Sequence, residues 1–530
     1  MEKKKASFVK GAAILAVAGL IVKIIGAAFR IPLANTIGSI GASYYDTAYP
    51  YYSWLLVISS SGLPTAISKL VSERTTLGDY RGAHKVFSTA MQVLLGIGLF
   101  TGIIMFFASD YIAEFHQLAE MANCFRALAP SLFFVSVMSA YRGYLQGMQQ
   151  MTPTAISQIV EQLGKLAAGL ALAYALLPKG PEYAAMGALI GVTISELLGM
   201  LYMMWEYRRR LPRIRARIKQ SLHLKEQPVA RKLLAIALPI TIGASISPLA
   251  GVVDSALILR ILLKLGYSKE MAQTAFSLLR TNVNTLTNMP GVLTMALAMS
   301  LVPAISACMA KRDRGGMQSA ARLGLKFAII VGLPCAVGLY VLAEPILSML
   351  YPYLSEGSLA VAADLMRTAS IGVIFLSLVQ AMTGVIQGFG KPNVPVFNLL
   401  IGFALKVVTL LVLMNIPDIN IQGAAVSTVV CYAFAGIADT IYIARKANLE
   451  LNVWDVLLKP LLSSLVMGFM VFMVRGFLVG QGHGTLATLA SVAAGVLVYA
   501  IAAVYLRFFT REELEYIPGG RKLRRLMYRD

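Results

Sequence analysis

Five basic side chains stand inside long apolar stretches of the sequence. They are Lys23, Arg30, Lys165, Arg280 and Lys406. A charge at the centre of a bilayer costs about 2.5 kcal/mol or more, so we expect these side chains to face a wet cavity or a partner. Lys and Arg groups that converge in a cleft of low dielectric constant hold phosphate strongly. This excess of bases over acids predicts a site for an anionic substrate, such as a lipid-linked pyrophosphate.

Four acidic side chains in apolar stretches are candidates to organise the bases or to bind a coupling cation. They are Asp46, Glu161, Glu196 and Asp254. Glu161 precedes Lys165 by one helical turn, so an ion pair between them is an alternative to a role in substrate binding. Asp254 has the same alternative with Arg260.

The basic residues in apolar stretches differ in what lies near them. Lys406 has Gly402 one turn before it and no nearby acid, so we expect it to be a free cation facing a central cavity. Lys69, Arg142 and Lys326 lie near the predicted cytoplasmic ends of helices, where a long side chain reaches the lipid head groups.

The sequence lacks the residue patterns of metal sites and of common enzyme active sites. The histidines are isolated and lie in predicted loops, at His84, His116, His223 and His483. A metal site or a catalytic histidine is therefore not expected. The sequence also lacks a G-x-x-x-x-G-K-[ST] nucleotide-binding loop and the acidic motifs of membrane glycosyltransferases. We expect neither an enzyme nor a cofactor, and the coupling ion or membrane potential that drives transport is left open.

The composition is that of a membrane protein. Hydrophobic residues make up 57% of the 530 positions and charged residues only 14%, and the mean hydropathy is +0.70. Apolar runs long enough to cross a bilayer predict about fourteen helices and an all-α polytopic membrane protein. Lys and Arg are concentrated in alternate connections, and the opposite loops hold only Lys179, Lys264, Lys269 and Arg475. The positive-inside rule then places both termini in the cytoplasm, in a cell membrane crossed many times.

The net charge of +21 has the same explanation. Basic loops at a cytoplasmic membrane surface attract anionic lipid, which we expect as a partner. Nucleic acid is not expected as one.

A constant offset along the chain pairs Arg126 with Arg367, Ser136 with Ser377 and Lys165 with Lys406. Such a repeat predicts two parallel six-helix lobes that are pseudo-symmetric and rock about a central site. The predicted regions are an N-lobe at 1–207, a basic cytoplasmic linker at 208–232, a C-lobe at 233–446, two further helices at 447–509 and a basic cytoplasmic tail at 510–530.

Two stretches carry a family resemblance. One runs from Gly62 to Glu73, and the other from Tyr141 through Gly147 to Gln162. They resemble the polysaccharide-transport branch of the multidrug/oligosaccharidyl-lipid/polysaccharide flippase superfamily, which includes stage V sporulation protein B-like and MurJ-type lipid II flippases. The resemblance covers about residues 5–510. It implies two lobes in a V shape with two extra helices, as in MATE and MurJ proteins.

The same resemblance implies a substrate and a site. Family members move an undecaprenyl-pyrophosphate-linked sugar from the inner to the outer leaflet for cell-wall synthesis. They carry bases in the first helix, an acid soon after it and an arginine in the eighth helix, which implies Lys23, Arg30, Asp46 and Arg280 here. Cell-wall synthesis enzymes are then expected partners. The alternative function is a MATE-type exporter of drugs or organic cations.

Overall fold

The computed structural model describes residues 2–221, 228–449, 452–479, 484–510, 513 and 528. Most of the predicted tail and part of the predicted linker therefore lie outside the described residues. Throughout the described ranges the chain forms helices and turns, without a strand. The predicted all-α class is confirmed.

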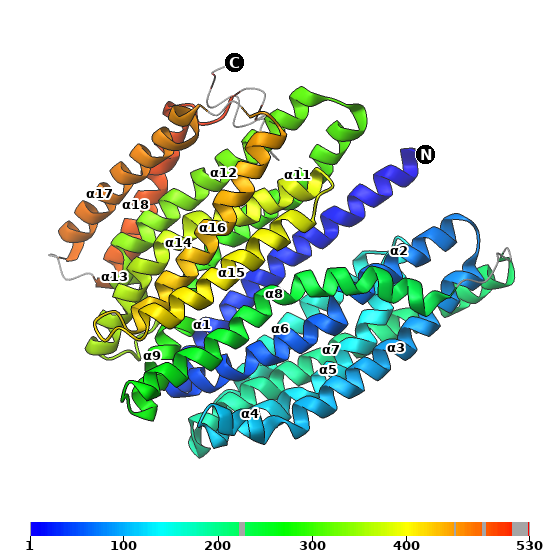
Figure 1. The fold of residues 1–530 in the computed structure, drawn as a ribbon, viewed down its shortest axis with the longest axis horizontal. Helices are drawn as coiled ribbons and strands as arrows, with labels where there is room; N and C mark the ends of the chain where they lie inside the picture. Colours follow the sequence, from blue (N-terminus) through cyan, green and yellow to red (C-terminus); the bar gives the residue numbers. More distant parts are fainter. Residues whose placement is uncertain are drawn as a thin grey trace. The chain divides into compact units, whose positions relative to one another are not determined.

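The first helix, α1 (Glu2–Ser60), is two helices joined at Gly38, whose φ of 66° and ψ of −176° are not helical. Figure 1 shows the chain turning back after the first half of α1 and running on to α2 (Gly62–Thr76). Glycine suits this position, because a positive φ strains residues that carry a Cβ. The kink therefore converts one long apolar segment into two antiparallel helices.

Contacts divide the chain into two units. The first comprises Met1–Arg260 and Ala272–Ser277. After α2 it contains α3 (Tyr80–Phe107), α4 (Ser109–Phe115), η1 (Ala119–Met121), α5 (Ala122–Gly147), α6 (Thr152–Leu176), η2 (Leu177–Lys179), α7 (Pro181–Lys219), most of α8 (Val229–Lys264) and most of α9 (Lys269–Ser277).

The second unit comprises Ile261–Met271 and Leu278–Asp530. It contains η3 (Leu278–Val283), α10 (Asn284–Thr287), α11 (Met289–Lys311), α12 (Arg314–Val341), α13 (Ala343–Leu350), α14 (Glu356–Gly388), α15 (Asn393–Leu413), α16 (Ile421–Lys446), η4 (Trp454–Leu458), α17 (Lys459–Val479) and α18 (Gly484–Tyr505).

The division between the units falls later in the chain than the predicted linker at 208–232. The first part of that linker continues α7 as a helix to Lys219. Helix α8 then packs on α2 so closely that a Cβ added to Gly62 would lie 2.2 Å from the carbonyl oxygen of Ala237. This packing associates α8 with the first unit.

Twelve helices in the described ranges are long and apolar enough to cross a membrane. One of them, Val17–Thr76, covers most of the first predicted span, 11–34, and all of the second, 47–72. The eighth predicted span, 280–308, corresponds to η3, α10 and α11, which are not among the twelve. The chain is thus a multi-pass membrane protein, and the predicted number of about fourteen spans is approximate.

The two units repeat the same internal contacts. In the first, α5 packs against α2, α3 and α7, and α6 against α7; in the second, α14 packs against α11, α12 and α16, and α15 against α16. A Cβ on Gly187 would lie 2.6 Å from the Leu172 carbonyl oxygen, and one on Gly423 would lie 2.8 Å from Leu413 Cβ. Leu172 and Leu413 are paired by the same offset as Lys165 and Lys406, so the repeat extends to the packing of the helices.

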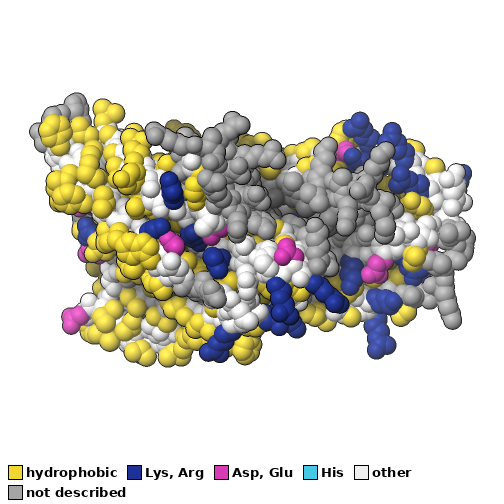
Figure 2. All heavy atoms as spheres, turned by 90° about the horizontal axis from the view of Figure 1, so that it is seen from above, with side chains coloured by type: hydrophobic (Ala, Val, Ile, Leu, Met, Phe, Trp, Pro, Cys, Tyr) yellow, Lys and Arg dark blue, Asp and Glu magenta, His cyan; other side chains and the backbone are white. Residues whose placement is uncertain are grey.

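Large apolar side chains are exposed along several helices, as expected for contact with lipid. Phe100 and Phe107 of α3 are exposed, as are Phe469 and Phe477 of α17. On the face drawn in Figure 2, hydrophobic side chains cover wide areas and most Lys and Arg lie in groups. Exposed apolar surface of this extent marks a membrane protein rather than a soluble one.

Candidate functional site

The kink of α1 brings Arg30 and Asp46 together. The guanidinium Nη2 of Arg30 lies 2.8 Å from Oδ1 of Asp46. The Asp46 side chain is 2% exposed and that of Arg30 is 28% exposed. An arginine has five N–H donors, and one carboxylate does not occupy them all. Asp46 therefore orients a guanidinium that keeps donors for a second anion.

Lys165 of α6 lies against aromatic rings of the same unit. Its Nζ is 4.5 Å from the centroid of the Tyr49 ring, 5.0 Å from that of Phe29 and 5.9 Å from that of Tyr45. Nζ also donates to the Tyr49 hydroxyl at 3.4 Å. Tyr45 and Tyr49 are stacked, with their centroids 5.3 Å apart. Such rings attract an ammonium group through their quadrupoles, which holds Lys165 without removing its charge.

The alternative of an ion pair between Glu161 and Lys165 is wrong. Glu161 pairs with Arg142 of α5, and both side chains are largely buried. Arg142 also donates to Ser157 Oγ, from Nε at 3.0 Å and from Nη2 at 2.8 Å. Arg142 therefore has partners within the protein, whereas the sequence predicted that it reaches the lipid head groups. Within the described residues, Lys165 has no carboxylate at ion-pair distance.

Glu196 of α7 lies close to this pair and is buried. Its Oε1 accepts a hydrogen bond from the Tyr52 hydroxyl at 3.3 Å. Among the described residues Oε2 has no hydrogen-bond partner. An ionised carboxylate with this environment is costly, which makes Glu196 a candidate to hold a proton or a cation.

Lys23 is exposed on α1, two turns before Arg30 and on the same face of the helix. Gly26 lies between them and faces α6, since a Cβ there would be 3.7 Å from Oε1 of Gln162. The structure thus places Lys23, Arg30 and Lys165 on facing sides of α1 and α6.

The other predicted site residues lie elsewhere. Arg280 is in the π-helical η3, and Lys406 is in α15 of the second unit. Lys406 is 6% exposed and has a partner, so the expectation of a free cation is wrong. Asp254 of α8 is buried and partnered as well, and Arg260 lies over the Phe115 ring at 5.1 Å. Convergence of bases from both halves stays a prediction.

The sequence matches two family models. One, described as polysaccharide biosynthesis protein, matches residues 8–309, and the other, MatE, matches residues 281–412. The chain belongs to the polysaccharide biosynthesis protein family. It is a member of the multidrug/oligosaccharidyl-lipid/polysaccharide superfamily, as its motifs predicted.

Individual proteins agree with this assignment. The chain is 27% identical to stage V sporulation protein B of Bacillus subtilis (strain 168), over 97% of this chain and 98% of the relative. It is 25% identical to the lipid II flippase MurJ of the same organism, over 96% and 97%. A solved structure of lipid II flippase MurJ, in an inward closed conformation, matches with a TM-score of 0.68 and 17% identity, covering 93% of this chain and 98% of that one. The last likeness shows the MurJ-like fold.

Proposed function

We propose that this protein is a flippase for an undecaprenyl-pyrophosphate-linked cell-wall precursor, lipid II or a related lipid-linked oligosaccharide. It carries the precursor from the inner to the outer leaflet of the cytoplasmic membrane by alternating access, and both its termini are cytoplasmic. Membership of the polysaccharide biosynthesis family supports this proposal. So do full-length relatives named for sporulation and for lipid II flipping.

Charged residues of the first unit, namely Lys23, Arg30, Asp46 and Lys165, supply the chemistry for binding pyrophosphate. A pyrophosphate carries several anionic oxygens, which accept charge-assisted hydrogen bonds from guanidinium and ammonium groups. Arg30 offers the donors that Asp46 leaves, and Lys165 offers an ammonium that faces rings rather than a carboxylate. Lys23 extends the positive surface along α1. Arg280 and Lys406 are the proposed contributions of the second half.

Among the described residues no carboxylate lies at ion-pair distance from Lys165, and this observation carries the proposal. We expect Lys165→Met and Arg30→Ala to slow translocation by about tenfold or more, since a hydrogen bond to a charged group contributes about 1.5–3 kcal/mol. The assay is transfer of fluorescent lipid II across proteoliposome membranes, with equal amounts of each variant reconstituted. Lys69→Met is the matched control, because Lys69 is an exposed lysine of α2 in the same unit. Full transport by both site variants would refute the assignment.

A second candidate function is export of organic cations. The MatE match at residues 281–412 favours it, and aromatic clusters such as Phe29, Tyr45 and Tyr49 bind organic cations in other proteins. In this chain, however, the ammonium of Lys165 occupies the cluster. Binding measurements on the purified protein separate the two functions. An exporter binds a quaternary ammonium dye and ignores lipid pyrophosphate, whereas a flippase does the reverse.

A further inference from the structure

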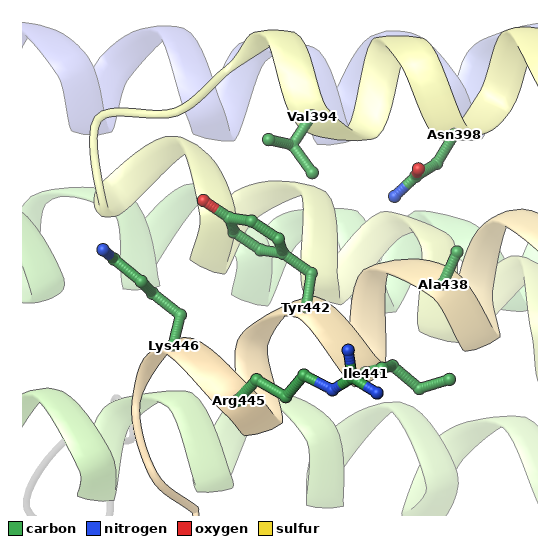
Figure 3. A pocket seen from close by; sticks show the side chains of 7 residues that line it. All are labelled: Val394, Asn398, Ala438, Ile441, Tyr442, Arg445 and Lys446. Carbon is green, nitrogen blue, oxygen red and sulfur yellow. The ribbon is translucent and has the colours of Figure 1, made fainter.

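The second unit contains a cavity of about 570 Å³ between the beginning of α15 and the end of α16. Figure 3 shows the side chains that line it: Val394, Asn398, Ala438, Ile441, Tyr442, Arg445 and Lys446. Its volume falls in the range of about 300–1,000 Å³ that is usual for small-molecule sites. The candidate transport site of the first unit uses none of these residues.

Two basic side chains line the cavity. Arg445 and Lys446 lie in the last turn of α16, and both are exposed. Helix α15 begins at Asn393 without a side-chain hydrogen bond to cap it. Pro392 and Pro395 have no N–H, and the N–H of Val394 donates to the Lys391 carbonyl oxygen at 3.2 Å. The positive charge at the cavity therefore comes from the two side chains rather than from free backbone donors. Figure 3 shows the Tyr442 hydroxyl on the side of the Lys446 ammonium, whereas the Arg445 guanidinium extends toward Ile441.

The rest of the cavity is apolar. Val394, Ala438 and Ile441 form its wall, and Ile441 is 47% exposed. The carboxylate of Asp439, the residue after Ala438, is fully buried and accepts a hydrogen bond from Asn398 Nδ2 at 2.7 Å. It is not among the described residues that line the cavity. A ligand that fits has an anionic head and an apolar body.

We propose that the cavity binds an anionic phospholipid, with its phosphate at Arg445 and Lys446 and its acyl chains along Val394 and Ile441. The predicted topology puts this end of α16 at the cytoplasmic surface, where anionic lipids are enriched and attract basic residues. The apolar wall distinguishes the site from one for free phosphate. The lipid is a resident of the protein rather than its cargo.

The test measures lipid binding to the full-length protein, delipidated in a neutral detergent, by native mass spectrometry. We expect phosphatidylglycerol to bind more tightly than phosphatidylcholine. Arg445→Gln/Lys446→Gln should weaken phosphatidylglycerol binding about 25-fold, since each basic residue near a lipid surface contributes roughly a fivefold factor. Arg312→Gln/Arg314→Gln is the matched control. It removes the same charge from exposed positions of the second unit outside the cavity.

A second variant separates a cavity from a diffuse charge effect. Ala438→Leu keeps both bases and fills the apolar part, so we expect it to weaken phosphatidylglycerol binding while leaving the charge unchanged. Equal binding of the two lipids overturns the proposal, and so does an equal loss in the control. Undecaprenyl phosphate provides the last arm. If it binds here in preference to phosphatidylglycerol, the cavity belongs to the transported substrate and the proposal is wrong.

Discussion

At the scale of single residues, the basic side chains of the first unit differ in how far a carboxylate compensates their charge. Arg142 and Glu161 compensate each other, Arg30 is held by Asp46, and Lys165 rests on aromatic rings. A paired charge is well suited to holding helices together, whereas a charge that faces only rings is available to a ligand. The first kind should matter chiefly for stability and the second for transport.

The Arg142–Glu161 pair provides a test of this division. We expect Arg142→Met or Glu161→Gln alone to lower the free energy of unfolding by about 3 kcal/mol or more, because each leaves a buried charge without its partner. Arg142→Met/Glu161→Met should lose less than either single variant. Unfolding by SDS in mixed micelles measures these differences.

The exposed pair between Arg126 and Asp110 of the same unit is the control. Asp110→Asn should change stability by less than about 1 kcal/mol, as is usual for surface pairs. If the single variants at Arg142 and Glu161 are as mild as Asp110→Asn, that pair does not stabilise the unit.

The sequence indicates that these charged residues need a cavity or a counterion, but it does not indicate which partner each residue has. A basic residue in an apolar run signals a cavity or a counterion by its cost alone. Lys165 and Tyr49 are far apart in the sequence, however, and only the packing of α6 on α1 brings them together. Lys165 is four residues from Glu161 in the sequence, whereas Arg142 is on α5. Glu161 nevertheless pairs with Arg142 in the folded unit.

At the scale of elements, Gly38 determines how the first two spans meet. Gly38→Ala should destabilise the protein by about 1–3 kcal/mol, because a φ of 66° with a ψ of −176° lies in a region of backbone conformation that essentially only glycine adopts. Gly38→Asn should cost about as much, since asparagine tolerates the left-handed helical region, where ψ is about +30 to +60°, and not this one. The midpoint of thermal unfolding in detergent reports both effects.

Gly19 of the same helix is the matched control, because a Cβ there would meet no atom within 4 Å. Gly19→Ala should leave the midpoint unchanged or raise it, since alanine favours helices more than glycine does. A Gly38→Ala protein as stable as the Gly19→Ala protein would show that the kink does not need glycine.

The periodic arrangement of elements was accessible from the sequence, and the predicted domain boundaries stay a prediction. The offset that pairs Lys165 with Lys406 also pairs Leu172 with Leu413. Leu172 packs against Gly187, and Leu413 packs against Gly423. Helix α8 approaches α2 at Gly62, where an added Cβ would lie 2.2 Å from the Ala237 carbonyl oxygen. A hydropathy pattern contains no information about such a contact.

At the scale of the whole molecule, Glu513 pairs with a helix that lies far earlier in the sequence. Lys326 of α12 and Glu513 form an ion pair at 3.0 Å, and both side chains are 4% exposed. Glu513 Oε2 also accepts from the backbone N–H of Thr510 at 2.9 Å. Phe508 is buried against Tyr499, with ring centroids 5.7 Å apart. Lys326 therefore has a carboxylate partner rather than the lipid head groups expected for it.

Glu513→Gln should lower the free energy of unfolding by about 3 kcal/mol or more, because it leaves Lys326 buried and unpaired. Lys326→Met/Glu513→Met should restore most of that loss. Asp455→Asn is the control, since Asp455 forms a more exposed pair with Lys459 in the same unit. SDS unfolding measures all three. Wild-type stability of the Glu513→Gln protein would refute a structural role for the pair.

The bond between Arg30 and Asp46 also bears on how the chain enters the membrane during synthesis. Arg30 leaves the ribosome before Asp46, so its charge has no counterion until the second half of α1 follows. Inserting an arginine alone costs about 2.5–3.5 kcal/mol at mid-membrane. We therefore expect the translocon to release these two segments into lipid as a hairpin rather than one at a time.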